Sequence, residues 1–209
     1  ATLFIMRSTM RHGHLSADYD LSGPQKFHGR PVPRVGGAGV MVAIVAGGLV
    51  AQISDSPAVR NLWLLIACSL PAFFVGLAED LTKNVSPRRR LLATAVSSGL
   101  AIWLLDGLIT KTAIPGIDQL VQWAPFAVLL TVFVITGVAN AVNIIDGFNG
   151  LASMCVLMMV LALGYVAFQV GDTFIFTAAL ITAGAVLGFF VWNFPAGLIF
   201  LGDGGAYLL

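Results

Sequence analysis

The sequence predicts an all-α fold, a polytopic bundle of transmembrane helices. Of its 209 residues, 58% are hydrophobic and only 10% are charged, whereas a soluble domain is nearer half apolar and a quarter charged. The apolar residues gather in runs close to the length that crosses a bilayer core of about 30 Å. No long segment carries the polar stripe of a helix on a soluble protein. We expect one integral-membrane domain over residues 1–209, truncated at both ends.

About six complete spans are predicted, with partial spans at both ends of the chain. Residues 1–6 resemble the tail of a preceding span, and the sequence stops at Leu209 inside another apolar run. The complete spans are expected at residues 36–53, 61–78, 91–105, 124–143, 151–168 and 173–192. Glycines in the first span favour close helix packing, and Pro71 predicts a kink in the second. Ser86 and Pro87 are suited to begin the third.

Four polar segments fall on one side of the membrane if the spans alternate in direction. They are expected as loops or turns at residues 7–35, 79–90, 140–151 and 193–205. This side holds nine of the eleven lysines and arginines, and only Arg60 and Lys111 lie on the other. The positive-inside rule makes the basic side cytoplasmic. The unusual polar residues are therefore expected to share one cytoplasmic site.

Two of these segments carry acidic residues suited to bind a divalent cation. Glu79 and Asp80 are adjacent at the end of the second span, and Asp203 lies in Leu-Gly-Asp-Gly-Gly-Ala. Adjacent acids can share a proton or a cation, and Mg²⁺ commonly takes one or two carboxylates together with water and phosphate oxygens. The alternatives are that the acidic pair marks the end of a span and that Gly-Asp-Gly is a simple turn.

The third polar segment places three polar side chains at a spacing of three residues. On a continuing helix, Asn140, Asn143 and Asp146 form one stripe, and such groups are costly against lipid. The stripe should therefore face protein, water or ligand, and an interhelical hydrogen-bond cluster is the alternative to a binding site. We favour ligand contact because Gly147 and Gly150 permit a sharp turn and a close approach of the backbone.

Basic residues on the same side are candidates for binding phosphate. Lys26, His28 and Arg34 precede the paired glycines of the first span, and three consecutive arginines, residues 88–90, precede the third. Their default role is to set topology and to bind anionic lipid headgroups. Arginine is also a natural ligand for phosphate, because its guanidinium offers paired donors.

Four stretches together resemble a known family, the polyprenyl-phosphate N-acetylhexosamine-1-phosphate transferases of glycosyltransferase family 4. They are Lys-Phe-His-Gly-Arg-Pro-Val-Pro-Arg-Val-Gly-Gly at residues 26–37, Gly-Leu-Ala-Glu-Asp-Leu at 76–81, the polar segment with its next residue at 140–152, and Phe-Leu-Gly-Asp-Gly-Gly at 200–205. The stretches occur in the family's order and cover the chain nearly end to end. Any one of them is a weak signal, whereas the ordered set is specific.

The resemblance implies a multi-pass enzyme of the bacterial plasma membrane with a cytoplasmic active face. It would transfer an N-acetylhexosamine 1-phosphate from a UDP-sugar to undecaprenyl or another polyprenyl phosphate, release UMP, and initiate a cell-envelope polysaccharide. Mg²⁺ is the implied cofactor, with Mn²⁺ as a substitute. The implied partners are UDP-N-acetylhexosamine, polyprenyl phosphate and membrane lipid. No nucleic acid is expected, and a homodimer is left open.

The resemblance also implies a role for individual residues. Glu79, Asp80 and Asp203 are the implied catalytic residues, with Asp203 and Asp80 as metal ligands and Asp80 beside the lipid phosphate. The implied substrate-binding residues are Lys26, His28, Arg34, Asn140, Asn143, Asp146 and Asn149. Of these, Asn143, Asp146 and Asn149 would line the nucleotide.

The sequence departs from the family at two of these positions. Glu79 stands where an aspartate is usual, so its longer side chain must reach differently or play a supporting role, and Asn149 replaces a common aspartate. The Pro-Val-Pro-Arg form of the first stretch is closer to the initiators of O-antigen synthesis than to the peptidoglycan enzyme.

Other functions predict a different placement of acids. An ion-coupled secondary transporter, the main alternative, would place at least one acid in the middle of a span. A lipid enzyme of the CDP-alcohol phosphotransferase type would carry several aspartates along one helix. Here no acid follows Asp146 until Asp172. A purely structural subunit would leave the one-sided polar clusters unexplained.

Overall fold

A computed structural model describes residues 32–209, and within this range every regular element is a helix. The helices are α2 (Gly36–Ile53), α3 (Val59–Thr82), α4 (Pro87–Leu105), α5 (Ile117–Leu120), α6 (Ala124–Ile145), α7 (Leu151–Val170), α8 (Thr173–Asn193) and α9 (Gly202–Leu208). Lys26 and His28, with most of the predicted loop 7–35, lie outside the described residues. The all-α prediction is confirmed.

Five of the helices, α2, α3, α6, α7 and α8, are long and apolar enough to cross a membrane. The third predicted span is present as α4, but three arginines in its first turn make it more polar than the others. The six complete spans that we expected therefore exist as six long helices, of which five have the length and composition of a span. The chain is a multi-pass membrane protein.

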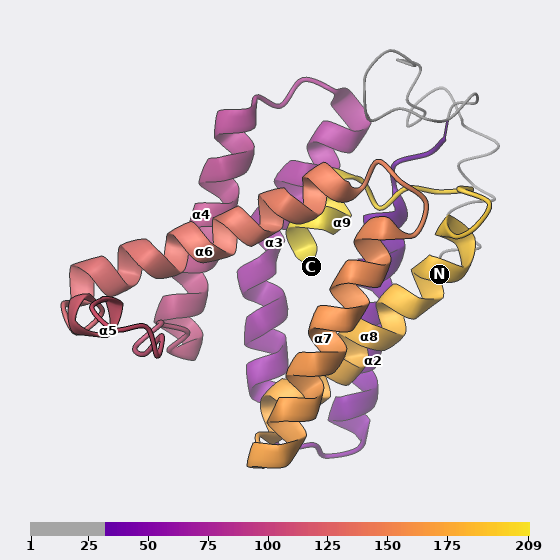
Figure 1. The fold of residues 1–209 in the computed structure, drawn as a ribbon. Coiled ribbons are helices and arrows are strands. Elements are labelled where there is room, and N and C mark those ends of the chain that lie inside the picture. The colour runs from indigo at the N-terminus through magenta and orange to yellow at the C-terminus, as the bar shows by residue number, and fades with distance from the viewer. Residues whose placement is uncertain (1–31) are drawn as a thin grey trace.

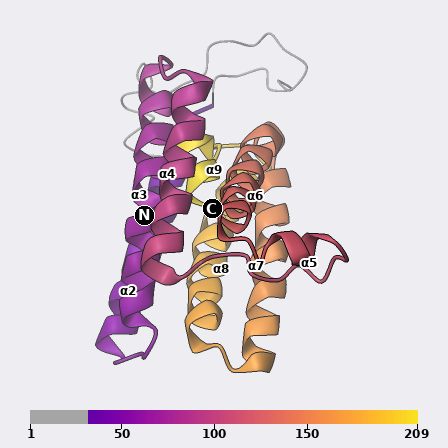
Figure 2. The same cartoon turned by 90° about the vertical axis from the view of Figure 1, so that its left-hand side faces the viewer.

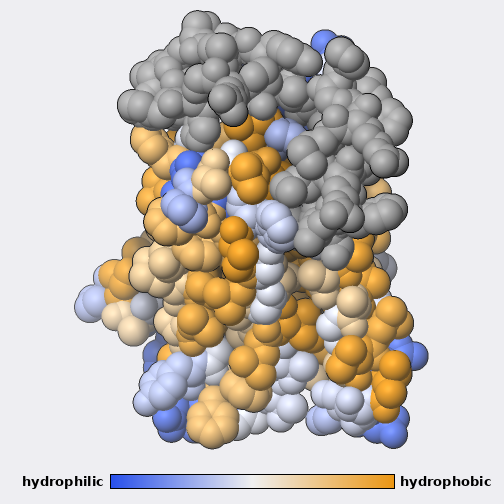
Figure 3. Space-filling view, turned by 90° about the vertical axis from the view of Figure 1, so that its right-hand side faces the viewer, coloured by the Kyte–Doolittle hydropathy of each residue, from blue (hydrophilic) through white to orange (hydrophobic). Residues whose placement is uncertain are grey.

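Apolar side chains cover much of the outside of the bundle. Leu129 and Phe133 of α6 are exposed, as are Leu163 and Phe168 of α7. Figure 3 shows an apolar band across the middle of one face, with polar residues gathered at its lower end. Exposing so much apolar surface to water is unfavourable, so this surface is suited to the hydrocarbon of a bilayer.

The predicted end of the second span was wrong. Helix α3 continues to Thr82, and Lys83 closes it in the left-handed conformation, with φ of 56°. Glu79 and Asp80 therefore lie in the last helical turn instead of after it. The physical reason is that Asp80 is buried among hydrogen-bond donors of another segment, so a carboxylate inside this helix is not exposed to lipid.

The loop predicted at residues 79–90 is accordingly shorter. It comprises residues 83–86, because α4 begins at Pro87. Ser86 occupies the position before the helix in an extended conformation, and Pro87 begins the first turn, as expected. The three arginines that follow are helical.

The other two polar segments are partly helical as well. Asn140 and Asn143 belong to α6, and the turn proper covers residues 146–150. Gly150 has a positive φ of 79° just before α7, a conformation that glycine adopts at little cost. Asn193 is the last residue of α8, and an irregular segment leads from there to α9.

The helices enclose the short α9. Helices α2 and α3 form one hairpin and α7 and α8 another, α2 packs on α8, and α4 packs on α3 and α6. Figures 1 and 2 show α9 in the middle of this arrangement, where it contacts α2, α3 and α6. The α3–α4 loop, the turn after α6 and the segment before α9 all lie at the upper end in Figure 1. The described parts of the predicted polar segments therefore share one end of the bundle.

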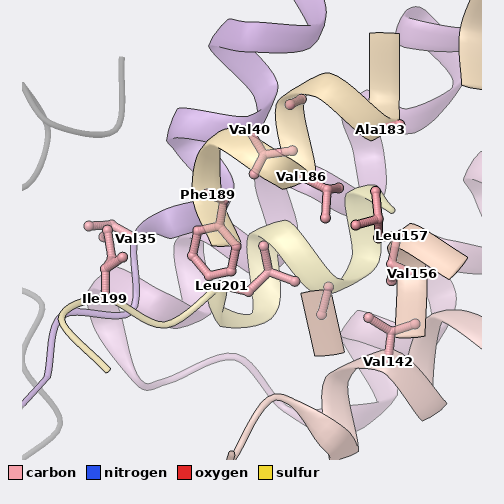
Figure 4. Close-up of a cluster of buried hydrophobic side chains, with 12 residues drawn as sticks. Val35, Val40, Val142, Val156, Leu157, Ala183, Val186, Phe189, Ile199 and Leu201 are labelled. Carbon is pink, nitrogen blue, oxygen red and sulfur yellow. The ribbon is translucent and has the colours of Figure 1, made fainter. Parts of the chain in front are cut away.

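A hydrophobic core lies directly beneath this end. Figure 4 shows Val40 of α2, Val186 and Phe189 of α8, and Ile199 and Leu201 of the segment before α9 packed together. All five are at most 1% exposed. Burying side chains of this size stabilises a fold by about 1.5–3 kcal/mol each. The core therefore holds the segment before α9, which leads directly to Asp203, firmly against α2 and α8.

Candidate active site

The first turn of α9 is held by two carboxylates from other helices. Asp146, just after α6, accepts hydrogen bonds from the backbone N–H groups of Gly202 at 2.8 Å and Leu201 at 3.4 Å. Asp80 of α3 accepts from the N–H groups of Asp203 at 2.9 Å and Gly204 at 2.8 Å. The first N–H groups of a helix have no partner within it, and its N-terminus carries partial positive charge. Both carboxylates satisfy these needs.

Both acids are buried in protein. Asp80 is 1% exposed and Asp146 is 6% exposed. A carboxylate oxygen has more than one lone pair, so these contacts leave acceptor capacity on each side chain. The predicted roles of Asp80 as a metal ligand and of Asp146 as a nucleotide contact stay predictions.

The Asp203 side chain meets two further partners. Its Oδ1 accepts a hydrogen bond from the Nδ2 group of Asn143 at 2.8 Å, and its Oδ2 forms an ion pair with Nη1 of Arg90. Asp203 thus brings together α6, through Asn143, and the first turn of α4, through Arg90. Two predicted site residues, Asp80 and Asn143, hydrogen-bond to Asp203.

Arg90 is a residue that the sequence analysis did not single out. Arg88 and Arg89 are exposed, whereas Arg90 lies on the inner face of α4 with Thr94 and Ser98, which are buried. The three positions are four residues apart and therefore lie on one face of a helix. This polar stripe, Arg90, Thr94 and Ser98, is the signal that could have identified Arg90.

The predicted stripe on α6 is confirmed as a shared face. Asn143 and Asp146 contact Asp203 and the segment before it, and Asn140 lies 3.5 Å from the hydroxyl of Tyr207, which donates to its Oδ1. Asn140 also donates to the carbonyl of Thr136. The hydrogen bonds observed correspond to the interhelical alternative. A ligand role for these side chains stays a prediction.

Glu79 contacts the α3–α4 loop. Its Oε2 accepts a hydrogen bond from the N–H group of Val85 at 2.7 Å. The longer side chain therefore fixes the loop that precedes the arginines of α4. This contact agrees with a supporting role, one of the two expectations for a glutamate at this position.

Asn149 lies in the turn between α6 and α7, at the end of the bundle that carries the predicted polar segments. Its Nδ2 group donates to the carbonyl of Pro195 at 2.9 Å. Nearby, Asn193 accepts from the N–H group of Gly150 at 2.6 Å and donates to the carbonyl of Ile199 at 2.8 Å. Asn193, which the sequence analysis missed, thus ties the turn after α6 to the segment before α9.

The stretch around Arg34 runs alongside the segment before α9. Phe200 donates to the carbonyl of Pro33 at 2.9 Å and accepts from Gly36 at 2.9 Å, and the N–H group of Gly37 donates to the carbonyl of Leu201 at 2.8 Å. Two of the stretches that resemble the family are therefore in direct contact, although they are far apart in the sequence.

Burial raises the pKa of Asp146 to about 7. Hydrogen bonds from Gly202 and Leu201 and the positive charge of Arg34 act in the opposite direction, and the negative charge of Asp80 adds to the rise. Arg34 is thus close enough to Asp146 for its charge to act there. Asp146 is a titrating group near neutral pH at the polar end of the bundle.

Close packing at α9 explains a glycine in α3. A Cβ atom on Gly76 would lie 2.6 Å from the carbonyl carbon and oxygen of Asp203. Only glycine permits this approach of two backbones. The approach is what brings Asp80, one turn further along α3, under the first turn of α9.

The donor set is suited to magnesium. The described residues contain no group of three or more His, Cys, Asp or Glu side chains placed to hold a metal ion by themselves. Mg²⁺ does not need one, because it binds through one or two carboxylates and keeps water and phosphate oxygens as its other ligands. Asp203, with Asp80 behind it, offers oxygen ligands of this kind.

An apolar groove begins beside this site. It lies between α4 and α6, has a volume of about 490 Å³, and is lined by apolar residues such as Leu91, Leu92 and Phe133. Thr136 and Asn140 are its polar members. Asn140 also contacts Tyr207 of α9 and lies one turn before Asn143, so the groove approaches the face of α6 that meets Asp203.

The comparisons with known proteins agree on one family. The sequence model of glycosyl transferase family 4 matches residues 62–209. A phospho-N-acetylmuramoyl-pentapeptide-transferase of Ruegeria pomeroyi is 31% identical, over 90% of this chain and 59% of the relative. One from Streptococcus thermophilus is 30% identical, over 82% and 45%.

A third relative is named for a different substrate. It is a probable undecaprenyl-phosphate N-acetylglucosaminyl 1-phosphate transferase of Bacillus subtilis, 28% identical over 91% of this chain and 52% of the relative. The chain spans about half the length of the curated relatives that it matches. The family match covers well over half of the chain, and the chain belongs to glycosyl transferase family 4.

Proposed function

We propose that this protein transfers an N-acetylhexosamine 1-phosphate from a UDP-sugar to undecaprenyl or another polyprenyl phosphate and releases UMP. The observation that carries the proposal is the convergence of Asp80, Asp146 and Asp203 on the first turn of α9, with Asn143 and Arg90 on the Asp203 carboxylate. The names of the relatives supply the class of reaction. The product would initiate a cell-envelope polysaccharide.

The site is proposed to face the cytoplasm of a bacterium. Nine of the eleven lysines and arginines belong to residues 7–35 and 79–90, two of the four predicted polar segments. Basic residues favour the cytoplasmic side. UDP-sugars are cytoplasmic, and the acceptor lipid lies in the membrane. A site at one end of the bundle can reach both.

Magnesium is the proposed cofactor, held by Asp203 and Asp80, with manganese as a substitute. When bound, it would neutralise charge on the diphosphate of the UDP-sugar. The protein's own residues arrange the site around it. Asn143 orients the Asp203 carboxylate through its amide, and Asp80 and Asp146 fix the turn from which Asp203 projects.

The two substrates are proposed to approach from different sides. The apolar groove between α4 and α6 suits the prenyl chain of the acceptor, because it opens among lipid-facing side chains and is lined by Asn140, one turn from Asn143 on α6. The acceptor phosphate would then lie near Asp80 and attack the β-phosphate of the donor in line. Asn143, Asp146 and Asn149 are proposed to line the nucleotide, with Lys26, His28 and Arg34 available for its phosphates.

The transporter alternative has no support from the three relatives described above, which are named as transferases. The three acids also meet at the first turn of α9, next to the loop and turns that share one end of the bundle, whereas ion-coupled transport uses sites near the middle of the membrane.

A membrane assay tests the proposed function. Membranes containing the protein would be incubated with undecaprenyl phosphate, Mg²⁺ and each of a panel of UDP-N-acetylhexosamines, and UMP would be quantified. We expect UMP release that requires the lipid phosphate, the divalent cation and at least one sugar of the panel. Failure of every sugar to yield UMP would refute the proposal. An Asp106→Asn variant serves as a control, because Asp106 is exposed and follows the C-terminal end of α4, whereas the first turn of α4 contacts Asp203.

A further inference from the structure

Among the described residues, one ion pair holds Arg90 inside the candidate site. Its Nη1 group contacts Oδ2 of Asp203, and its side chain is 19% exposed, whereas the neighbouring Arg88 and Arg89 are exposed to solvent. The pair links the first turn of α4 to the first turn of α9. Arg90 therefore has a function in the site beyond the topological role that its neighbours serve.

Each oxygen of the Asp203 carboxylate has a partner in the protein. Oδ2 faces the guanidinium of Arg90, and Oδ1 accepts the amide of Asn143. A divalent cation that binds this carboxylate would be repelled by a guanidinium on the same oxygen. Asn143 is neutral and raises no such conflict. Of the two partners, Arg90 is the one whose charge opposes cation binding.

The ion pair also does not satisfy all the hydrogen-bond donors of Arg90. Its Nε–H group is buried and has no hydrogen-bond partner among the described residues, and an unsatisfied buried donor costs about 1–3 kcal/mol. The Nε–H group and one terminal amino group of arginine form the fork that binds two oxygens of a phosphate. In the ion pair with Asp203, this fork is not used.

We propose that Arg90 and the divalent cation compete for the Asp203 carboxylate. Without the cation, the guanidinium holds the carboxylate in place and neutralises it. When the cation binds, Arg90 is released and its fork takes oxygens of a substrate phosphate. Arg90 is thus a positioning residue for Asp203 in one state and a phosphate ligand in the other. The inference rests on the proposed function in taking Asp203 as a ligand of the cation.

Manganese binding in the absence of substrate tests the competition without any turnover. The protein would be purified in detergent, and free Mn²⁺ would be measured by electron paramagnetic resonance during a titration. Wild type would be compared with Arg90→Gln and with Arg89→Gln, which removes the same charge from an exposed neighbour. An Asp203→Asn variant would locate the ion.

We expect Arg90→Gln to bind Mn²⁺ about tenfold more tightly than wild type, as removal of one opposing charge at contact distance implies. Arg89→Gln should bind like wild type, and Asp203→Asn should lose the site. Equal or weaker binding by Arg90→Gln, including no detectable binding by either protein, would overturn the competition. An equal gain in Arg89→Gln would overturn it too, because general charge would then be the cause.

A second variant and a second ligand complete the test. Arg90→Lys keeps the charge and loses the fork, so its Mn²⁺ affinity should lie between those of wild type and Arg90→Gln, and it serves if Arg90→Gln does not fold. At saturating Mn²⁺, pyrophosphate should bind more weakly to Arg90→Gln than to wild type or Arg89→Gln. Unchanged pyrophosphate binding would overturn the role of Arg90 as a phosphate ligand. None of these measurements uses UMP release, so failure of the proposed function can be distinguished from failure of this inference.

Discussion

The carboxylate of Asp80 accepts hydrogen bonds from the backbone N–H groups of Asp203 and Gly204. Asp80 and Asp203 are 123 residues apart in the sequence, so this contact is a product of the tertiary fold. It aims the side chain of Asp203 away from the helix axis of α9, toward Arg90 and Asn143. Asp80 therefore has a structural role, whether or not it also takes part in the reaction.

Replacing Asp80 with Asn should destabilise the protein as well as reduce its activity. The amide keeps one acceptor oxygen and turns an N–H donor toward a backbone N–H group. Leaving a buried donor unsatisfied costs about 1–3 kcal/mol. The thermal unfolding midpoint in detergent should fall relative to wild type, while Asp106→Asn should leave it unchanged. A stable but inactive Asp80→Asn protein would show that the residue is needed for chemistry alone.

Adding a methyl group to Gly76 should separate α3 from α9. The new Cβ would lie 2.6 Å from the backbone of Asp203, and relieving such a clash costs about 1–3 kcal/mol. Gly99 of α4 is the matched control, because nothing lies within 4 Å of its Cβ position. Gly99→Ala should stabilise its helix by about 0.5–1 kcal/mol. Opposite shifts of the two unfolding midpoints are expected, and equal shifts would contradict the close approach.

The stability of the protein should depend on pH through Asp146. An unfolded aspartate loses its proton near pH 4, whereas the pKa of Asp146 in the folded protein is about 7. Between these values the folded state binds more protons. The free energy of unfolding therefore falls as the pH rises, by up to about 1.4 kcal/mol per pH unit.

The comparison with Asp146→Asn isolates this effect, because asparagine does not titrate. Unfolding midpoints of both proteins would be measured from pH 5 to pH 8. The advantage of wild type over the variant should shrink as the pH rises. A difference that is constant, or that grows with pH, would contradict a raised pKa of Asp146 in the folded protein.

Glu79 should be replaceable by Gln. The side-chain carbonyl of glutamine can accept the hydrogen bond of Val85, which holds the α3–α4 loop, whereas alanine cannot. Glu79→Gln should therefore retain most of the UMP release, and Glu79→Ala should lose much more of it. Equal loss in both variants would assign Glu79 a role that requires its charge.

Much of the fold could be predicted because apolar runs have clear boundaries. The first span was expected at 36–53, and α2 covers this range. Helices α6, α7 and α8 also begin where expected, at Ala124, Leu151 and Thr173. Proline, glycine or aspartate at these points fixes the boundary locally. Helix α5 was not predicted, because its four residues are too few to show a period.

The misjudged end of α3 and the overlooked Arg90 have a common cause. Asp80 can remain helical and buried only because the N–H groups of α9 meet it, and Arg90 faces inward only because Asp203 is there. Both partners lie more than 100 residues away. Local pattern can identify such residues as polar and unusual, whereas their pairing depends on the packed structure.

The most direct test of the central claim is UMP release by an Asp203→Asn variant. Membranes with wild type, Asp203→Asn or Asp106→Asn would be assayed with Mg²⁺, undecaprenyl phosphate and the UDP-sugar that wild type uses best. Loss of the carboxylate should lower the rate by about 1000-fold or more, as removal of several kcal/mol of charge stabilisation implies. Asp106→Asn should match wild type. Wild-type turnover by Asp203→Asn would contradict the placement of the active site at the first turn of α9.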